Sequence, residues 1–320
     1  MLHVLTVTFP FFALVACGFV AARRRLLPLQ AIPGLNSFVL FFALPCMLYR
    51  FGASTPIAQL LDRSVALTYL LCALLMVGFA VAVTLRGRIG WNDAAFGALV
   101  AAFPNTGFMG VPLLVALLGP AAAGPAIVTL MVDMVVTSSL CIGLSRLGRG
   151  SGGAGQAVRN TLKGVATNPM PWSILLGAAV SGLQIRFPQP LLQTVGLLAD
   201  AASPVALFTI GAVLARSQML AQTDATHAVP WHEYVPVALM KLLLHPMLVL
   251  LVGSLAIQLG VPLGRFALTV LVLLAALPSA GNVSLLAERF GADNGRIARI
   301  ILVSTAAAFF SFSVAVALIT

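Results

Sequence analysis

Two short stretches of this chain carry side chains that could bind a small anion. They lie at residues 101–107 (AAFPNTG) and 275–282 (AALPSAGN), and each interrupts a long apolar run. Both place amide and hydroxyl groups directly after a proline, and such groups can donate hydrogen bonds to a carboxylate. The candidate substrate-binding residues are Pro104, Asn105, Thr106, Gly107, Pro278, Ser279, Gly281 and Asn282.

The proline in each stretch should break a membrane helix in its middle. Proline has no backbone N–H to donate and clashes with the carbonyl one turn earlier, and the nearby glycine adds flexibility. In lipid, unpaired backbone groups cost several kcal/mol each, so a break is tolerated only where protein buries it or a water-filled cavity meets it. Paired breaks in corresponding halves of a chain point to a transporter. Alternatively, the polar side chains only satisfy the broken backbone.

A broken helix also offers the positive charge that an anion needs. The second half-helices should begin near Gly107 and near Asn282, and each N-terminus carries about half a positive charge and free N–H groups. The unwound carbonyls before each break could hold a cation. We therefore expect the two breaks to form a carboxylate site, with Na⁺ or H⁺ as the candidate coupling ion and no other cofactor.

Three ionisable residues inside apolar runs are candidates for ion or proton coupling. Asp133 stands near the centre of its run, where a charge costs at least about 2.5 kcal/mol, so it should face a cavity or a partner. Desolvation favours its neutral form and would allow it to bind a proton. Lys241 and His245 are four residues apart and should share a helix face. The structural alternatives are an ion pair or a hydrogen bond for Asp133, a stem that snorkels to the cytoplasmic interface for Lys241, and local backbone contacts for His245.

The composition places the chain in a membrane. Of its 320 residues, 60% are hydrophobic and 8% are charged, and its mean hydropathy is +1.06. A membrane helix needs roughly 20 apolar residues, which leaves room for about ten spans and no separate soluble domain. The net charge of +10 would suggest nucleic acid in a soluble protein. Because the basic residues lie between apolar runs, we expect the lipid bilayer, and no nucleic acid, as partner.

The apolar runs predict an all-α integral membrane protein with ten transmembrane helices. Five lie in residues 1–144, a glycine-rich cytoplasmic linker follows at residues 145–166, and five more lie in residues 167–320. In the seventh span we expect Pro204 to break the helix and Asp200 to cap the part that restarts. The ten spans cover residues 2–22, 33–52, 65–85, 94–118, 124–144, 169–183, 191–215, 235–259, 266–290 and 297–318.

The loops between these spans differ in charge, as the positive-inside rule requires. One side carries thirteen Lys and Arg residues and the other carries four. The first side should therefore face the cytoplasm, with both termini outside the cell inner (plasma) membrane.

The two halves of the chain match one another in spacing. For Pro104 and Pro278 the offset is 174 residues, which the longer loop before the eighth span can absorb. Because five spans is an odd number, the second half enters the membrane from the opposite side, which makes an inverted repeat. Four pairs of like residues are each 159 apart: Pro10 and Pro169, Gly18 and Gly177, Pro45 and Pro204, and Gly52 and Gly211.

Several short motifs resemble the auxin efflux carrier family over nearly the whole chain. The resemblance implies a fold like that of the bile acid:sodium symporters, with helices 1, 2, 6 and 7 as a scaffold, helices 3, 4, 5, 8, 9 and 10 as a transport domain, and discontinuous helices 4 and 9 crossing. It also implies a homodimer. The motifs are Leu35-Asn36-Ser37-Phe38 through Phe42-Ala43-Leu44-Pro45, FPNTGFMGVP from Phe103, Asn168-Pro169, SPVALF from Ser203, and PSAGNV from Pro278.

That family moves organic anions, among them auxin in plants and carboxylates such as malate or malonate in bacteria. Plant members often carry a long central cytoplasmic loop, whereas the loop here is short, which favours a bacterial-type carrier. We therefore expect a secondary active transporter of small organic anions, not an enzyme, that works by elevator-type alternating access. The alternatives are a small-ligand receptor or sensor, which would normally need a signalling domain, a channel, or a membrane enzyme with paired catalytic side chains inside its spans. The sequence leaves the substrate, the coupling ion and the direction of transport open.

Overall fold

Every regular element in the described part of the chain is helical. The computed structural model describes residues 2–55, 62–87, 89–147, 169–223 and 229–319. Most of the predicted linker at residues 145–166 lies outside these ranges. The α-helices are α1 (Leu2–Arg23), α2 (Ala31–Phe38), α3 (Leu44–Ser54), α5 (Arg63–Thr84), α6 (Trp91–Ala102), α7 (Val111–Leu118), α8 (Ala123–Val132), α9 (Ser138–Ser145), α11 (Pro169–Gly182), α12 (Gln189–Thr223), α13 (Val235–Leu239), α14 (His245–Gln258), α15 (Arg265–Ala275), α16 (Val283–Arg289) and α17 (Asn294–Ile319).

Four π-helical turns lie between these helices. They are η1 (Val39–Ala43), η2 (Thr106–Gly110), η4 (Asp133–Thr137) and η6 (Met240–Leu244). The turns η1, η4 and η6 join their neighbours without a gap, so α2–η1–α3, α8–η4–α9 and α13–η6–α14 are continuous. Such turns are rare in proteins and are frequent at functional sites. Three of the four contain a residue that the sequence marks as a site candidate.

Among the residues that the structure describes, seven helical segments are long and apolar enough to cross a membrane. Three shorter apolar helices accompany them, at Thr106–Leu118, Trp172–Gly182 and Arg265–Ala275. A helix or a broken pair of helices occupies each of the ten predicted ranges. The all-helical, multi-pass character is therefore confirmed, while ten crossings stay a prediction. The seven segments are Thr6–Arg23, Ala31–Ser54, Arg63–Thr84, Pro120–Ser145, Gln189–Arg216, Trp231–Gln258 and Asn294–Ile319.

The helix predicted to break at Pro204 does not break. α12 continues through this proline from Gln189 to Thr223. Proline removes one backbone hydrogen bond, but α1 and α3 both pack along α12 and hold the helix together across the gap. Asp200 therefore caps no restarting helix. It accepts a hydrogen bond from Arg50 Nη1 of α3 at 2.6 Å, and this exposed ion pair joins α3 to α12.

Arg296 is one of the thirteen Lys and Arg residues that the sequence assigns to the cytoplasmic side, and it is buried rather than solvated. Only 1% of it is exposed, and its guanidinium donates to the backbone carbonyls of Glu233 and Asp93, each at 2.9 Å. Gly97 leaves room for it, because a Cβ at that position would lie 2.9 Å from Nη1. Arg296 thus ties α17 to α6 and to the turn before α13, in addition to any role in orientation.

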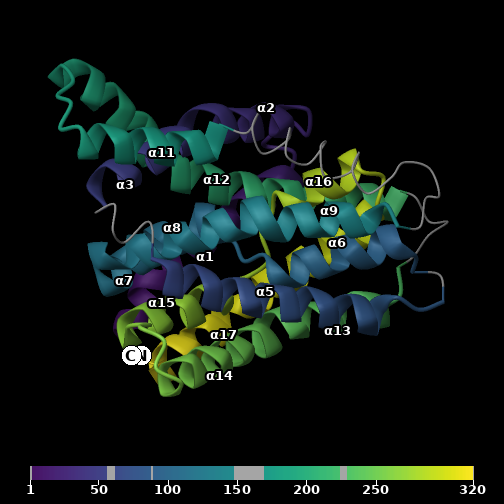
Figure 1. Cartoon of the computed structure of the whole chain (residues 1–320). Helices are drawn as coiled ribbons and strands as arrows, with labels where there is room; N and C mark the ends of the chain where they lie inside the picture. Colours follow the sequence, from purple (N-terminus) through teal and green to yellow (C-terminus); the bar gives the residue numbers. More distant parts are fainter. Residues whose placement is uncertain (1, 56–61, 88, 148–168, 224–228, 320) are drawn as a thin grey trace.

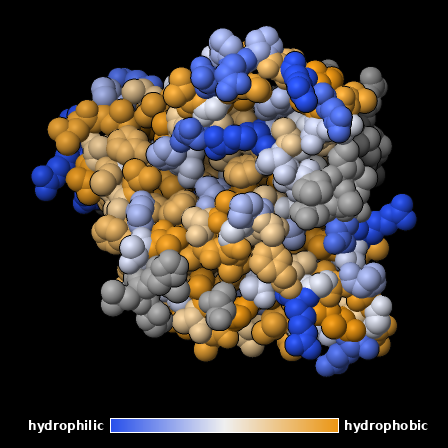
Figure 2. Space-filling model, turned by 90° about the vertical axis from the view of Figure 1, so that its left-hand side faces the viewer, coloured by the Kyte–Doolittle hydropathy of each residue, from blue (hydrophilic) through white to orange (hydrophobic). Residues whose placement is uncertain are grey.

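Figure 1 shows the helices stacked across the view, with α1, α6, α8 and α9 in the middle. α2, α3, α11 and α12 lie along the upper part of the view, and α5, α13, α14, α15 and α17 along the lower part. Both chain ends lie at the same end of the molecule. Figure 2 looks onto that end, where hydrophilic residues form separate groups among hydrophobic ones instead of one charged surface.

Two glycines allow α1 and α12 to touch backbone to backbone. A Cβ on Gly18 would overlap the carbonyl oxygen of Phe208, and a Cβ on Gly211 would overlap that of Val15. Small residues at such contacts are typical of closely packed membrane helices. The α1–α12 pair is therefore held at a distance that no larger residue permits.

α3 and α11 touch in the same way. A Cβ on Gly52 would overlap the carbonyl oxygen of Ile174, and a Cβ on Gly177 would overlap that of Tyr49. These contacts have counterparts between α1 and α12 if 159 is added to the residue number in α3 and subtracted from the residue number in α11. The contact of Gly52 with Ile174 then corresponds to that of Gly211 with Val15, and the contact of Gly177 with Tyr49 to that of Gly18 with Phe208. The glycine spacing found in the sequence thus corresponds to two equivalent helix pairs in space.

Candidate substrate and ion site

The structure contains both predicted helix breaks. α6 ends at Ala102 and the chain becomes helical again at Thr106, the first residue of η2. Phe103, between them, is extended, with φ −93° and ψ 102°. The ring of the following proline excludes the helical conformation there. In the second break, α15 ends at Ala275 and α16 begins at Val283. The half-helices therefore start within one residue of the predicted positions.

The two breaks contact each other through backbone hydrogen bonds. The N–H of Asn105 donates to the carbonyl of Pro278 at 2.8 Å, and the N–H of Ala280 donates to the carbonyl of Phe103 at 3.0 Å. Pro104 and Ser279 lie opposite one another in this short antiparallel bridge. Each break thus satisfies backbone groups of the other. The polar side chains are therefore not the only groups that satisfy the broken backbone.

Three of the predicted side chains are buried where the breaks meet. Asn105 is 4% exposed, Thr106 0% and Ser279 1%. Thr106 Oγ1 has no hydrogen-bond partner among the described residues. Neither Asn105 nor Asn282 uses its side chain to cap the helix that follows it. Ser304 of α17, which the sequence did not indicate, accepts a hydrogen bond from the Ser279 N–H at 3.3 Å.

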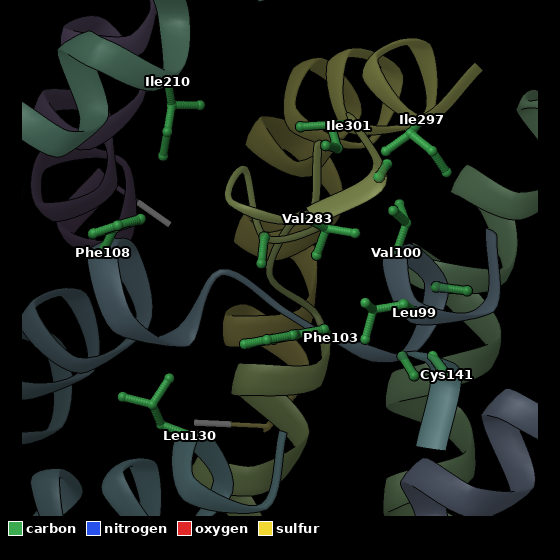
Figure 3. Packing of buried hydrophobic residues seen from close by; sticks show 14 of the residues in the cluster. Leu99, Val100, Phe103, Phe108, Leu130, Cys141, Ile210, Val283, Ile297 and Ile301 are labelled. Carbon is green, nitrogen blue, oxygen red and sulfur yellow. The ribbon is translucent and has the colours of Figure 1, made fainter. Parts of the chain in front are cut away.

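A narrow cavity lies beside the second break. α2, η1 and α12 form one wall, and η2, the second break, α16 and α17 form the other. Figure 3 shows Phe108 on η2, Ile210 on α12 and Ile301 on α17, all of which line the cavity. Only about 20 Å³ is open to the centre of a water molecule, which is room for about one water.

The cavity divides the predicted substrate-binding set. Gly281 and Asn282 line it. The other six residues, Pro104, Asn105, Thr106, Gly107, Pro278 and Ser279, are not among its lining residues. They lie at or next to the place where the two breaks pair. The sequence could not show which candidates line the cavity and which lie at the pairing of the breaks.

Asp133 is fully buried and held by two hydroxyl groups. Tyr69 Oη of α5 donates to Asp133 Oδ2 at 2.7 Å, and Thr137 Oγ1 donates to Oδ1 at 3.0 Å. Asp133 and Thr137 are the first and last residues of η4. The π turn therefore presents both side chains on the same side of the helix. The sequence predicted that Asp133 would face a cavity or a partner. Tyr69 and Thr137 are its partners, and the sequence did not indicate either of them.

Lys241 is also fully buried, so the prediction that it could snorkel to the interface is wrong. Its Nζ donates to the carbonyl of Ala275 at 2.6 Å and lies 3.1 Å from His245 Nδ1. Ala275 is the last residue of α15, so the ammonium group lies at the C-terminal end of a broken helix. A cation is favourable there, because the helix end carries unpaired carbonyls and partial negative charge.

The acidic and basic groups form one buried cluster. The Tyr69 ring, whose hydroxyl binds Asp133, lies 6.2 Å from the His245 ring, measured between centroids. The side chains of Asp133 and Lys241, both in the described part of the chain, form no direct ion pair with each other. The described residues contain no group of His, Cys, Asp and Glu that could hold a metal ion.

The family model described as "Membrane transport protein" matches residues 3–316. The chain belongs to this family. As a membrane transport protein it is a transporter and not an enzyme. A protein of Rhizobium meliloti (strain 1021) named "Putative malonate transporter" is 30% identical over 312 residues, which cover 95% of this chain and 92% of that protein.

More distant relatives connect this membrane transport protein to bacterial and plant carriers. "Uncharacterized transporter YfdV" of Escherichia coli (strain K12) is 25% identical over 287 residues, which cover 88% of this chain and 86% of that protein. "Probable auxin efflux carrier component 1d" of Oryza sativa subsp. japonica is 31% identical over 139 residues, which cover 42% of this chain and 25% of that protein. The resemblance to the auxin efflux carrier family is thereby confirmed.

Proposed function

We propose that this membrane transport protein is a secondary active carrier of small organic anions, most simply carboxylates. The observation that carries the proposal is the pairing of two broken helices beside a cavity with two separate walls. Broken helices at the membrane midplane are typical of substrate sites in secondary transporters. The relative named for malonate transport supports a carboxylate substrate.

The two walls correspond to the proposed scaffold and transport domain. We assign α1, α2–η1–α3, α11 and α12 to the scaffold, and the remaining helices to the transport domain. The glycine contacts that hold α1 to α12 and α3 to α11 give the scaffold a rigid backbone. The correspondence of these two sets of contacts at an offset of 159 residues supports two inverted five-helix repeats. In this arrangement the chain spans the membrane ten times, and helices 4 and 9 cross each other. Elevator-type alternating access then follows as a shift of one domain against the other.

Substrate binding in this proposal involves both breaks. Gly281 and Asn282 meet the substrate in the cavity, while Asn105, Thr106 and Ser279 hold the paired breaks in position behind it. The half-helix formed by η2 and α7 presents the positive end of its dipole near the cavity wall, which favours an anion.

Asp133, Lys241 and His245 are the proposed coupling residues. A carboxylate and an ammonium group that interact at full burial, next to the end of a broken helix, can respond to a bound proton or cation. H⁺ and Na⁺ are the candidate coupling ions. The remaining parts of the proposal are a plasma-membrane location with both termini outside, and a homodimer.

Uptake by proteoliposomes tests this function. The purified chain is reconstituted, and labelled malonate, malate and indole-3-acetate are offered with sodium and pH gradients imposed separately. We expect saturable uptake of at least one anion that depends on a gradient. Asn282→Ala should reduce this uptake at least about tenfold, the loss of about one charge-assisted hydrogen bond to the substrate. Asn105→Ala should also reduce uptake, because it loosens the paired breaks that hold Asn282 in position. A folded protein that takes up no anion would exclude the carrier function.

A further inference from the structure

The cavity beside the second break is polar only at a few points. Its apolar side chains include Val39, Phe108, Ile210 and Ile301, which come from both walls. A ligand that fills it must therefore present a hydrophobic surface on two sides, since contact with apolar walls is favourable only for apolar groups.

Two amide groups are the polar side chains that remain available in the cavity. The hydroxyl of Thr209 donates to the carbonyl of Val205 at 2.7 Å, and that of Ser284 donates to the carbonyl of Gly281 at 2.9 Å. The amides of Asn36 and Asn282 have no hydrogen-bond partner among the described residues, and both line the cavity, one from each wall. Each amide can donate two hydrogen bonds.

The cavity also lacks the charge that a dianion needs. No Lys, Arg or His lines it among the described residues. The positive end of the η2–α7 half-helix, thirteen residues long from Thr106 to Leu118, contributes about half a unit charge near Phe108. Together with two amides, this can stabilise one carboxylate. A second carboxylate would be buried against apolar side chains without a partner, which is strongly unfavourable.

We propose that this cavity selects monocarboxylates with a compact apolar body over dicarboxylates, and that Asn36 and Asn282 together bind the carboxylate. This inference rests on the proposed carrier function and narrows its substrate class. It departs from the dicarboxylate named for the Rhizobium relative, which is 30% identical. Because Asn36 and Asn282 lie on opposite walls, a bound carboxylate also bridges the two proposed domains.

Binding in detergent is the appropriate assay, because protonated monocarboxylic acids diffuse through liposome membranes. The unfolding temperature of the full-length chain is measured at pH 8 and constant ionic strength against increasing ligand concentration. The ligands are matched pairs that differ by one carboxylate: isobutyrate with methylmalonate, and phenylacetate with phenylmalonate. Isobutyramide serves as the uncharged analogue of isobutyrate.

We expect isobutyrate and phenylacetate to bind at least about tenfold more tightly than their dicarboxylate partners, and isobutyramide to bind weakly. Asn36→Ala and Asn282→Ala should each weaken isobutyrate binding, whereas Ser37→Ala should not. Ser37 is the matched control, since it neighbours Asn36 but is exposed and donates to the carbonyl of Pro33.

A cation placed in the cavity should reverse the preference. Val213 lines the cavity and is partly exposed, so Val213→Lys can direct its ammonium group inward. In this variant the ratio of the affinity for methylmalonate to that for isobutyrate should rise about tenfold over the ratio in the original chain. The neutral Val213→Met should leave the ratio unchanged. If Val213→Lys does not fold, Thr209→Lys takes its place.

The outcomes separate this inference from the carrier function. Equal or tighter binding of the dicarboxylates, or of isobutyramide, would overturn the selection of monocarboxylates and leave the carrier function intact. If no acid of either pair binds to a protein that is folded by size-exclusion chromatography, this inference fails, and the uptake assay decides the carrier function separately.

Discussion

At the scale of single residues, the buried cluster explains how two ionisable side chains can be accommodated inside a membrane protein. Lys241 donates to the last carbonyl of α15, and Asp133 accepts from two hydroxyl groups. Each charge therefore has its own hydrogen-bond partners and does not need direct contact with the other. Because no direct salt bridge joins Asp133 to Lys241, either group can change its protonation without breaking one, which suits a coupling site.

Replacement of Asp133 by asparagine tests coupling. Asp133→Asn keeps the size of the side chain and can still bind Tyr69, but it cannot carry charge. We expect exchange of labelled substrate across proteoliposomes to persist, while the dependence of net uptake on a pH or sodium gradient is lost. Thr137→Val is the matched control, because it removes one hydrogen bond to Asp133 and leaves the charge. Gradient-dependent uptake by Asp133→Asn would show that this residue has a structural role only.

The sequence could identify these charged residues but not their partners. Asp133 and Lys241 stand out because ionisable groups are rare inside apolar runs. Tyr69 lies 64 residues from Asp133, in an apolar run where a tyrosine is unremarkable, and only the packing of α5 against η4 brings the two together. Asn36 was quoted as part of a motif, but its position on the cavity wall depends on how α2 packs against α12.

At the scale of helices, the glycine contacts determine how closely α1 approaches α12 and α3 approaches α11. A Cβ at Gly211 would overlap a backbone carbonyl, which cannot move aside as a side chain can. Gly211→Ala should therefore lower the free energy of unfolding by about 1–3 kcal/mol, the usual cost of overpacking. Gly52→Ala, its counterpart 159 residues earlier, should cost a similar amount. Thermal unfolding in detergent measures both.

Gly196→Ala is the matched control for this test. Gly196 lies on α12 like Gly211, but nothing lies within 4 Å of the position of its Cβ. Alanine is favoured over glycine in a helix by up to about 1 kcal/mol, so this variant should be as stable as the original chain or more stable. If Gly211→Ala were as stable as Gly196→Ala, close backbone contact would not hold α1 to α12.

Helix breaks could be predicted where their cause is local. Pro104 and Pro278 each follow an apolar residue and precede small polar ones, and both breaks are present. Pro204 was misjudged because its effect depends on the support that α1 and α3 give to α12. The π turns could not be predicted either, since VLFFA in η1 and MKLLL in η6 resemble ordinary helical sequence.

At the scale of the whole molecule, the narrow cavity implies movement. An opening of about 20 Å³ admits about one water molecule but no carboxylate with a hydrocarbon body. Its two walls belong to different groups of helices, so if the cavity is the substrate site as proposed, the substrate can enter only when these groups separate or slide. The contact between Gly281 in the second break and Ile210 on α12 lies across this boundary.

A disulfide across this boundary tests whether the two groups move during transport. A Cβ at position 281 would lie 3.1 Å from Ile210 Cγ1, close to the roughly 3 Å between a Cβ and the far sulfur of a disulfide. We expect Gly281→Cys with Ile210→Cys, in a chain whose cysteines at 17, 46, 72 and 141 are replaced by serine, to lose uptake on oxidation and to recover it with dithiothreitol. Each single variant should be insensitive to oxidation. Undiminished uptake by fully cross-linked protein would mean that α12 and the second break move together, and the moving boundary would then have to lie elsewhere in the molecule.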